Sequence, residues 1–156
     1  MRRLRRHARS LKASVSTPAD AWLLARMLGW SAVLPVAKFA IPLPRLVRLM
    51  HSRRRARSRD AEREATIAGL AAWVFKTRPR ASRDNCLERA LVTYRYLSQA
   101  GANPELVVGL TQRTEGALGH AWVTVGGRAA HDDPESLRSY ATLLVFGSDG
   151  RIIRRD

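Results

Sequence analysis

The chain has little cysteine, few aromatic residues and few acidic residues. Of its 156 residues, one is a cysteine, Cys86, and 6% are aromatic. A single cysteine cannot form an internal disulfide, so the sequence excludes a disulfide-stabilised secreted scaffold and predicts a free thiol. With 46% apolar residues, the chain is long enough for one domain with a buried core, or for a small domain with a helical extension.

Acidic residues are scarce mainly in the first half of the chain. Residues 1–80 hold 19 Lys+Arg against 4 Asp+Glu, whereas residues 81–156 hold 9 of each, and the net charge is +15. We find no zinc-finger spacing, no helix-turn-helix pattern and no platform of interleaved basic and aromatic residues, so a nucleic-acid partner is not expected. The basic half predicts a solvated face, or a surface for an acidic protein or peptide.

The sequence also lacks an uninterrupted apolar run of membrane-spanning length. Residues 21–43 are long enough to cross a bilayer, but Arg26, Pro35 and Lys38 interrupt them, which predicts a buried or interfacial helix and leaves peripheral membrane contact open. The basic N-terminus is not followed by an apolar stretch with a small-residue cleavage pattern. No secretory signal is therefore predicted, and we expect a cytoplasmic protein.

Helix signals fill residues 1–80. A Thr17 or Ser16 cap followed by Pro18 predicts a helix from about residue 17, which Pro35 is expected to break or kink. A short helix is expected after Pro44. Residues 60–77 predict an amphipathic helix capped by Asp60.

From residue 82 the pattern changes to one helix followed by strands. Ser82 or Asp84 is the expected cap of that helix, and Gly101 its end. Strands are predicted at 104–112, 120–125, 128–132, 141–147 and 151–155, with hairpin turns at 126–127 and 148–150. The sequence therefore predicts an α+β protein: a helical, basic region over 1–80, and a core over 81–156 in which one helix packs on an antiparallel sheet.

Three residue types that cooperate in thiol catalysis occur in suitable places. Cys86 lies in the first turn of the predicted helix, where unpaired N–H groups favour a thiolate. His120 begins a strand, and Asp132 and Asp133 end the next one. A thiol nucleophile needs a base, and the base needs a third group that orients it. Taken singly, each residue has a simpler explanation: a cysteine in the core, a surface histidine, and an Asp-Asp-Pro turn or helix cap.

Two motifs resemble a known family. The segments "CLERALVTYRYLSQAGANPELVVGL" and "GHAWVTVGGRAAHDDPE" resemble the cysteine peptidases of lasso-peptide biosynthesis, in particular the stand-alone form of the microcin-processing B protein. The specific signals are Cys-Leu-x-Arg-Ala-Leu from Cys86, His-Ala-Trp-Val from His120, and an acidic residue 12 positions after that histidine. Thr124 departs from the pattern, which has glutamate there. The resemblance is strong over residues 82–135 and general over the helical half.

The resemblance implies a transglutaminase-like, papain-related fold. It also implies a Cys86 nucleophile, a His120 general base and acid, and an orienting carboxylate at Asp132. The implied reaction is removal of the leader from a ribosomally synthesised lasso precursor, with no cofactor. The implied partners are the precursor leader, a separate leader-recognition protein and a lasso cyclase.

Two alternatives remain, and one inference conflicts with the resemblance. The protein could be a transglutaminase-like acyltransferase or hydrolase acting on another substrate, or a basic module that binds a membrane or nucleic acid and uses Cys86 structurally. A plain two-residue hairpin at 126–127 would place Asp133, rather than Asp132, opposite His120. Because the resemblance selects Asp132, we expect a bulge or a three-residue loop that shifts the register by one before residue 132.

Overall fold

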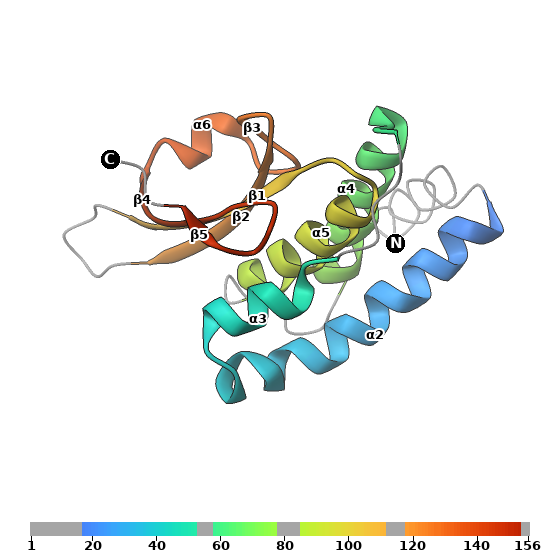
Figure 1. Ribbon diagram of the computed structural model, residues 1–156, viewed down its shortest axis with the longest axis horizontal. Helices are drawn as coiled ribbons and strands as arrows, with labels where there is room; N and C mark the ends of the chain where they lie inside the picture. The colour runs from blue at the N-terminus through green and yellow to red at the C-terminus, as the bar shows by residue number, and fades with distance from the viewer. Residues whose placement is uncertain (1–16, 53–57, 78–84, 112–117, 154–156) are drawn as a thin grey trace, which may run out of the picture.

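Helices form the first half of the chain and a sheet forms most of the second. The computed structural model describes residues 17–52, 58–77, 85–111 and 118–153. Figure 1 shows the helices that precede the sheet in the chain gathered on one side of it. The helices are α2 (Pro18–Ala40), α3 (Leu43–Met50), α4 (Ala61–Lys76), α5 (Cys86–Gln99) and the short α6 (Pro134–Leu137); the strands are β1 (Pro104–Thr111), β2 (Gly119–Val125), β3 (Arg128–Ala129), β4 (Tyr140–Phe146) and β5 (Ile152–Ile153).

The five strands form one antiparallel sheet in the order β3-β2-β1-β4-β5. β1 lies at its centre, and a register shift between Val108 and Gly109 interrupts its pairing with β4. This arrangement confirms the α+β class and the packing of a cysteine-bearing helix on an antiparallel sheet. The predicted boundary between residues 80 and 81 lies outside the described residues, and the division into two regions stays a prediction.

Local signals set the start of α2 as expected. The Thr17 hydroxyl accepts a hydrogen bond from the Asp20 backbone N–H at 3.2 Å, and the Asp20 carboxylate accepts one from the Thr17 N–H at 3.0 Å. This reciprocal capping box satisfies two donors that the first helical turn leaves free. The helix then runs through Pro35 to Ala40 without the expected break. Proline removes one N–H donor, but burial of Leu34 beside it keeps the helix against the core.

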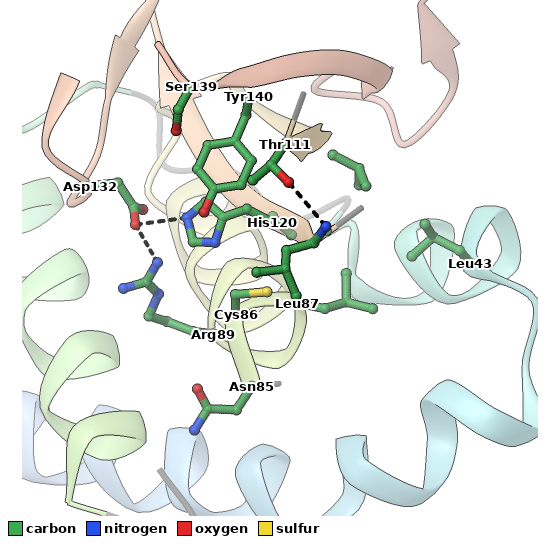
Figure 2. Close-up of a pocket in the computed structure, with 14 residues that line it drawn as sticks. Leu43, Asn85, Cys86, Leu87, Arg89, Thr111, His120, Asp132, Ser139 and Tyr140 are labelled. Carbon is green, nitrogen blue, oxygen red and sulfur yellow. Dashed lines mark hydrogen bonds and ion pairs between the residues drawn. The ribbon is translucent and has the colours of Figure 1, made fainter. Parts of the chain in front are cut away.

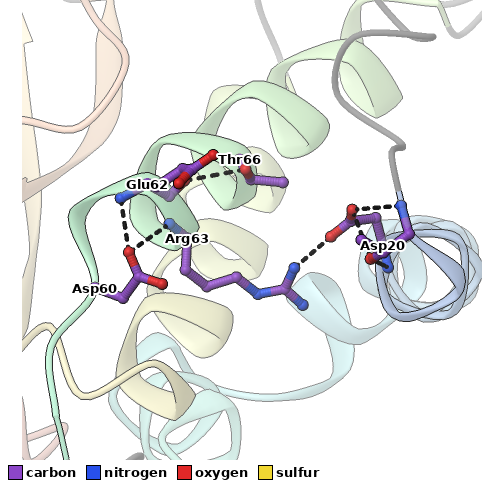
Figure 3. A network of polar contacts seen from close by, with 6 residues as sticks. Asp20, Asp60, Glu62, Arg63 and Thr66 are labelled. Atoms are coloured by element: carbon purple, nitrogen blue, oxygen red, sulfur yellow. Dashed lines mark hydrogen bonds and ion pairs between the residues drawn. The ribbon is translucent and has the colours of Figure 1, made fainter.

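An ion pair joins α2 to α4. Arg63 of α4 contacts the buried Asp20 carboxylate, and Asp60 caps α4 by accepting from the N–H groups of Glu62 and Arg63 at 2.9 and 3.3 Å (Figure 3). Hydrogen bonds from Thr17 and the Arg63 guanidinium lower the pKa of Asp20 in spite of its burial. The predicted Asp60 cap is thus confirmed, and Arg63 in the same turn of α4 binds Asp20 of α2.

Helix α5 ends where the glycine predicts. Gly101 has φ of 78°, and the N–H groups of Gly101 and Ala102 donate to the carbonyls of Ser98 and Leu97 at 3.2 and 3.1 Å. This Schellman arrangement needs a left-handed residue that glycine adopts without strain. The predicted caps at the other end, Ser82 and Asp84, lie outside the described residues. In the structure Asn85 occupies the N-cap position and its side chain makes no capping hydrogen bond.

The main core lies between the helices and one face of the sheet. It joins residues of α2 through α5 to β1, β2 and β4, and includes Met27, Leu34, Val74, Leu91 and Phe146. A second cluster covers the opposite face, where Trp122 packs with Val107 and Val145 below α6. Neighbouring residues of a strand face opposite sides of the sheet, so β1 buries Leu106 in the first core and Val107 in the second. Both faces of the central strand are therefore covered, which holds the adjacent β2 in place.

Candidate active site

Helix α5 brings Cys86 to the edge of the sheet. Cys86 is the first residue of the helix and is half-buried. Figure 2 shows Cys86 in the pocket below the His120 ring, with Asp132 on the far side of the ring. All three residues predicted for the site therefore come together, from a helix, a strand and the segment that follows β3.

The surroundings of the Cys86 thiol favour its ionised form. Burial raises the pKa of the thiol, but hydrogen bonds from His120 and from the backbone N–H groups of Ala121 and Leu87 outweigh it, so the pKa lies below the usual value of 9.0. The N-terminus of α5 adds the positive end of the helix dipole. A cysteine that served only to fill the core would lack these donors.

Strand β2 places His120 beside two aromatic rings. The imidazole stacks on Trp122, with ring centroids 5.9 Å apart and planes at 19°, and lies 5.0 Å from the Tyr140 ring. Gly109 of β1 pairs with His120 and leaves room for this arrangement. A Cβ at position 109 would lie 3.0 Å from the Trp122 ring and 2.9 Å from the Ala141 carbonyl oxygen.

Asp132 orients the imidazole. His120 Nε2 lies 3.2 Å from Asp132 Oδ1, which leaves Nδ1 as the ring nitrogen available to the thiol. The hydrogen bond to Asp132, together with the interaction with Cys86, raises the pKa of His120 from 6.5 to about 9. A raised imidazole pKa beside a lowered thiol pKa favours a thiolate–imidazolium pair at neutral pH.

The backbone conformation that produces this geometry differs from the one we expected. The hairpin is a plain two-residue turn, with Val125 paired to Arg128, so the expected bulge or three-residue loop is absent from it. The predicted strand 128–132 is also too long, because β3 ends at Ala129 and residues 130–132 form bends. Once the chain leaves the ladder, the alternation of side chains no longer applies. The bend directs Asp132 to His120.

Asp133 has the separate role that was expected of it. Its carboxylate accepts a hydrogen bond from the Ser136 N–H at 3.2 Å and caps α6, which begins at Pro134. Of the two adjacent acidic residues, Asp132 thus contacts the imidazole and Asp133 caps a helix.

Sequence reasoning missed the role of Arg89. This residue lies one turn after Cys86 on α5, and its guanidinium contacts the same Asp132 oxygen that accepts from His120. Burial raises the pKa of Asp132, but the hydrogen bond with His120 and the charge of Arg89 lower it overall. The arginine in Cys-Leu-x-Arg was visible as part of a motif, but its partner lies 43 residues away in the chain.

An open pocket of about 810 Å³ extends from the Cys86 sulfur. Apolar side chains form much of its wall, and Tyr140, which no sequence signal singled out, lies beside the imidazole. Asn85 also borders the pocket, but its amide nitrogen donates to the Phe75 carbonyl at 3.3 Å and so ties α5 to the end of α4. The lining comprises Leu43, Asn85, Cys86, Leu87, Arg89, Val108, Thr111, Leu118, Gly119, His120, Ala121, Asp132, Ser139 and Tyr140.

Thr124, which departs from the pattern of the resemblance, has a partner outside the site. Its hydroxyl donates a hydrogen bond to Glu105 of β1 at 3.2 Å.

The described residues contain no group of three or more His, Cys, Asp or Glu side chains that could hold a metal ion. The chemistry available to the described residues of the pocket is that of a thiol, an imidazole and a carboxylate in series.

Comparison with known proteins agrees with this arrangement. Residues 24–145 match the model of the transglutaminase-like superfamily. Searches of curated proteins and of solved structures each found no match. Members of this superfamily are typically enzymes of the cysteine protease or acyltransferase type. Since the match extends over most of the chain, this protein belongs to the transglutaminase-like superfamily.

Proposed function

We propose that this protein is a cysteine peptidase that cleaves one peptide bond in a ribosomally synthesised lasso precursor and so removes the leader. The observation that carries the proposal is the series Cys86–His120–Asp132 at the end of an open pocket, with the thiol pKa lowered and the imidazole pKa raised to about 9. The motifs around Cys86 and His120, and their resemblance to leader peptidases, support the choice of substrate. A purely structural role for Cys86 would explain neither the pocket nor the paired pKa shifts.

The proposed reaction has two stages. The Cys86 thiolate attacks the scissile carbonyl, and the His120 imidazolium protonates the departing amine, which leaves a thioester between Cys86 and the leader. Neutral His120 then takes a proton from water, which hydrolyses the thioester and regenerates the thiol. Asp132 holds the ring throughout and stabilises its charged form. The Cys86 backbone N–H, at a helix start where it has no helical partner, is the proposed donor to the oxyanion.

The proposed partners are the precursor leader, a separate leader-recognition protein and a lasso cyclase. The excess of basic residues in the first half supports a surface for such partners. Arg53, Arg54, Arg55 and Arg57 lie outside the described residues, whereas Arg59 is paired with Glu64. Charge reversal at the first four should raise KM for the precursor far more than it lowers kcat, because exposed charges act on encounter. Unchanged KM would remove this segment from the proposal.

The decisive experiment is cleavage of a precursor peptide in the presence of its recognition protein. Mass spectrometry should find leader and core with a summed mass equal to that of the precursor plus one water. Cys86→Ala, Cys86→Ser and His120→Ala should each lose several orders of magnitude in turnover, because the residues act as a unit. Unfolding curves that match the wild type would show that the fold survives. Near-wild-type turnover by Cys86→Ala would refute the peptidase proposal.

Acyl transfer is the alternative that the same chemistry allows. The thioester at Cys86 can react with an amine in place of water, and the open pocket leaves access for either. Addition of glycinamide to the cleavage reaction distinguishes the two. A leader fragment that carries the amine as its main product would indicate an acyltransferase, whereas a free carboxylate would indicate a peptidase.

A further inference from the structure

Helix α2 presents an apolar face that nothing in the described structure covers. Figure 1 shows α2 along the outer edge of the helical half, with the other helices on one side of it only. Trp22 is 67% exposed, Val36 71% and Phe39 85%. Leu28 and Val33 are exposed as well, and the residues between them on this face are alanine or glycine. Large side chains exposed together in this way mark an interaction surface.

The opposite side of α2 is already committed to the protein core. Leu23, Met27 and Leu34 are buried, and Asp20 is held by Arg63 of α4. The helix has the length and mean hydropathy, 1.3, of a membrane span, and 22% of that window is buried. Since one side packs on α4 and α5, α2 cannot cross a bilayer without leaving the fold. It can lie flat against a surface.

Positive charge predominates in the half of the chain that carries this face, where residues 1–80 hold 19 Lys+Arg against 4 Asp+Glu. Arg26 is the one charged residue among the exposed residues of α2, and it lies 5.7 Å from the centre of the Tyr96 ring. Residues 1–16, which precede the helix, contain six basic residues and no acidic one. Arg45 and Arg48 are exposed on α3, next in the chain. An exposed apolar helix face in a protein of net charge +15 complements a surface that is apolar within and anionic at its boundary with water.

An anionic lipid surface fits this face better than a protein does. A second copy would bring two chains of charge +15 together. A protein partner would require about one hydrogen bond per 100–200 Å² of interface, whereas the exposed face of α2 offers the Arg26 guanidinium and the Trp22 indole. Trp22 and Phe39 lie near opposite ends of the helix, roughly 25 Å apart at 1.5 Å per residue. Both can enter the headgroup region when the helix axis is parallel to the membrane.

We propose that the outer face of α2 docks this protein on an anionic membrane surface, with Trp22, Val36 and Phe39 inserted among the lipids and the net positive charge of the chain attracting it to the phosphates. The pocket at Cys86 need not take part. This inference is therefore independent of the proposed reaction, and the two are tested separately.

Sedimentation with sucrose-loaded vesicles tests the proposal. The full chain should bind vesicles of equimolar phosphatidylcholine and phosphatidylglycerol, bind phosphatidylcholine alone much more weakly, and lose affinity as NaCl is raised. Val36→Ser/Phe39→Ser should reduce partitioning about tenfold or more, because two large apolar side chains are lost from the contact. The matched control is Leu143→Ser on β4, which is 59% exposed and lies off α2, and it should bind as the wild type does.

A second measurement avoids any effect of the double substitution on folding. Brominated lipids should quench the fluorescence of the wild-type chain, and Trp22→Phe should remove that quenching although three other tryptophans remain. Wild-type binding by the double variant, or no binding to anionic vesicles, would overturn the proposal. A wild-type dimer that the double variant converts to monomers, without vesicle binding, would assign the face to self-association instead.

Discussion

Replacing Asp132 by asparagine tests the centre of the site with minimal change in shape. One oxygen of Asp132 faces both His120 Nε2, at 3.2 Å, and the Arg89 guanidinium. An asparagine amide lacks the negative charge that stabilises the imidazolium, and when its NH2 group faces His120 Nε2 it fixes the ring in the other tautomer. By analogy with an orienting aspartate in a serine triad, kcat should fall about 10⁴-fold, equivalent to about 5 kcal/mol in the activation barrier.

The pKa of His120 gives this prediction a second readout. The hydrogen bond to Asp132 is the largest cause that raises this pKa from 6.5 to about 9, so Asp132→Asn should move it back toward 6.5. A raised folded-state pKa contributes stability that is present below pH 6.5 and is lost as pH rises through the folded value. The Cys86 proton opposes this effect, because the folded-state thiol ionises earlier than the unfolded one. The measurement therefore belongs in a Cys86→Ala background, which removes the contribution of the thiol.

Two assays and a matched neighbour decide the outcome. Initial rates of precursor cleavage give kcat and KM, and thermal unfolding of Cys86→Ala with and without Asp132→Asn gives the pH dependence. Asp133→Asn is the control, because Asp133 caps α6 and asparagine can replace it as a cap, so stability and kcat should change little; Asp133→Ala, which removes the cap, should cost about 0.5–2 kcal/mol of stability. If Asp132→Asn retains more than a tenth of wild-type kcat while Asp133→Asn loses activity, the assignment of the carboxylate is wrong.

Three further predictions concern the same region. The thiol of Cys86 should react with iodoacetamide with a midpoint of the rate–pH profile below pH 9.0. His120→Ala should shift this midpoint upward, because burial still raises the thiol pKa while the hydrogen bond from His120 that lowers it is lost. An unshifted midpoint would contradict the pairing of the thiol with His120. Arg89→Gln should lower kcat with little change in KM and should raise the pKa of the Asp132 carboxylate. Arg89→Lys should restore part of the activity, because it restores the positive charge. Equal loss of activity in both variants would indicate that Arg89 has a structural role only. Gly109→Ala should destabilise the fold by about 1–3 kcal/mol in thermal unfolding, because its Cβ would meet backbone and ring atoms. The control is Gly119→Ala, which should be close to neutral because the atom nearest to its Cβ would be 3.8 Å away. Equal effects of the two substitutions would refute this reasoning.

The elements of the fold follow closely from local sequence signals. The Thr17 and Asp60 caps and the Gly101 terminus each involve residues within five positions of one another, so a short stretch of sequence contains all the partners. Pro35 is the exception. Its local preference predicted a break or a kink, whereas the helix continues through it to Ala40, with Leu34 beside it buried in the core.

The site itself shows where such reasoning stops. Alternation along a strand predicts side-chain directions only while the strand continues, and β3 ends at Ala129, three residues before Asp132. The sequence contained no signal for the end of β3, because the conformation of the bend that follows depends on the contact between Asp132 and Arg89, which lies far away in the chain. The resemblance to leader peptidases selected the residue that faces the imidazole, although the mechanism we expected, a register shift in the hairpin, was wrong.

The sequence by itself determined most of the helical and strand segments, the position of Cys86 at a helix start, and the candidate partners His120 and the pair Asp132 and Asp133, of which the resemblance selected Asp132. These depend on short-range hydrogen bonding, side-chain periodicity and motif spacing. Only the tertiary structure decided that Arg89 shares the Asp132 oxygen with His120, that Gly109 makes room for the stacked rings, and that one face of α2 stays uncovered. Those features depend on distances between residues far apart in the chain, and no local preference encodes such distances.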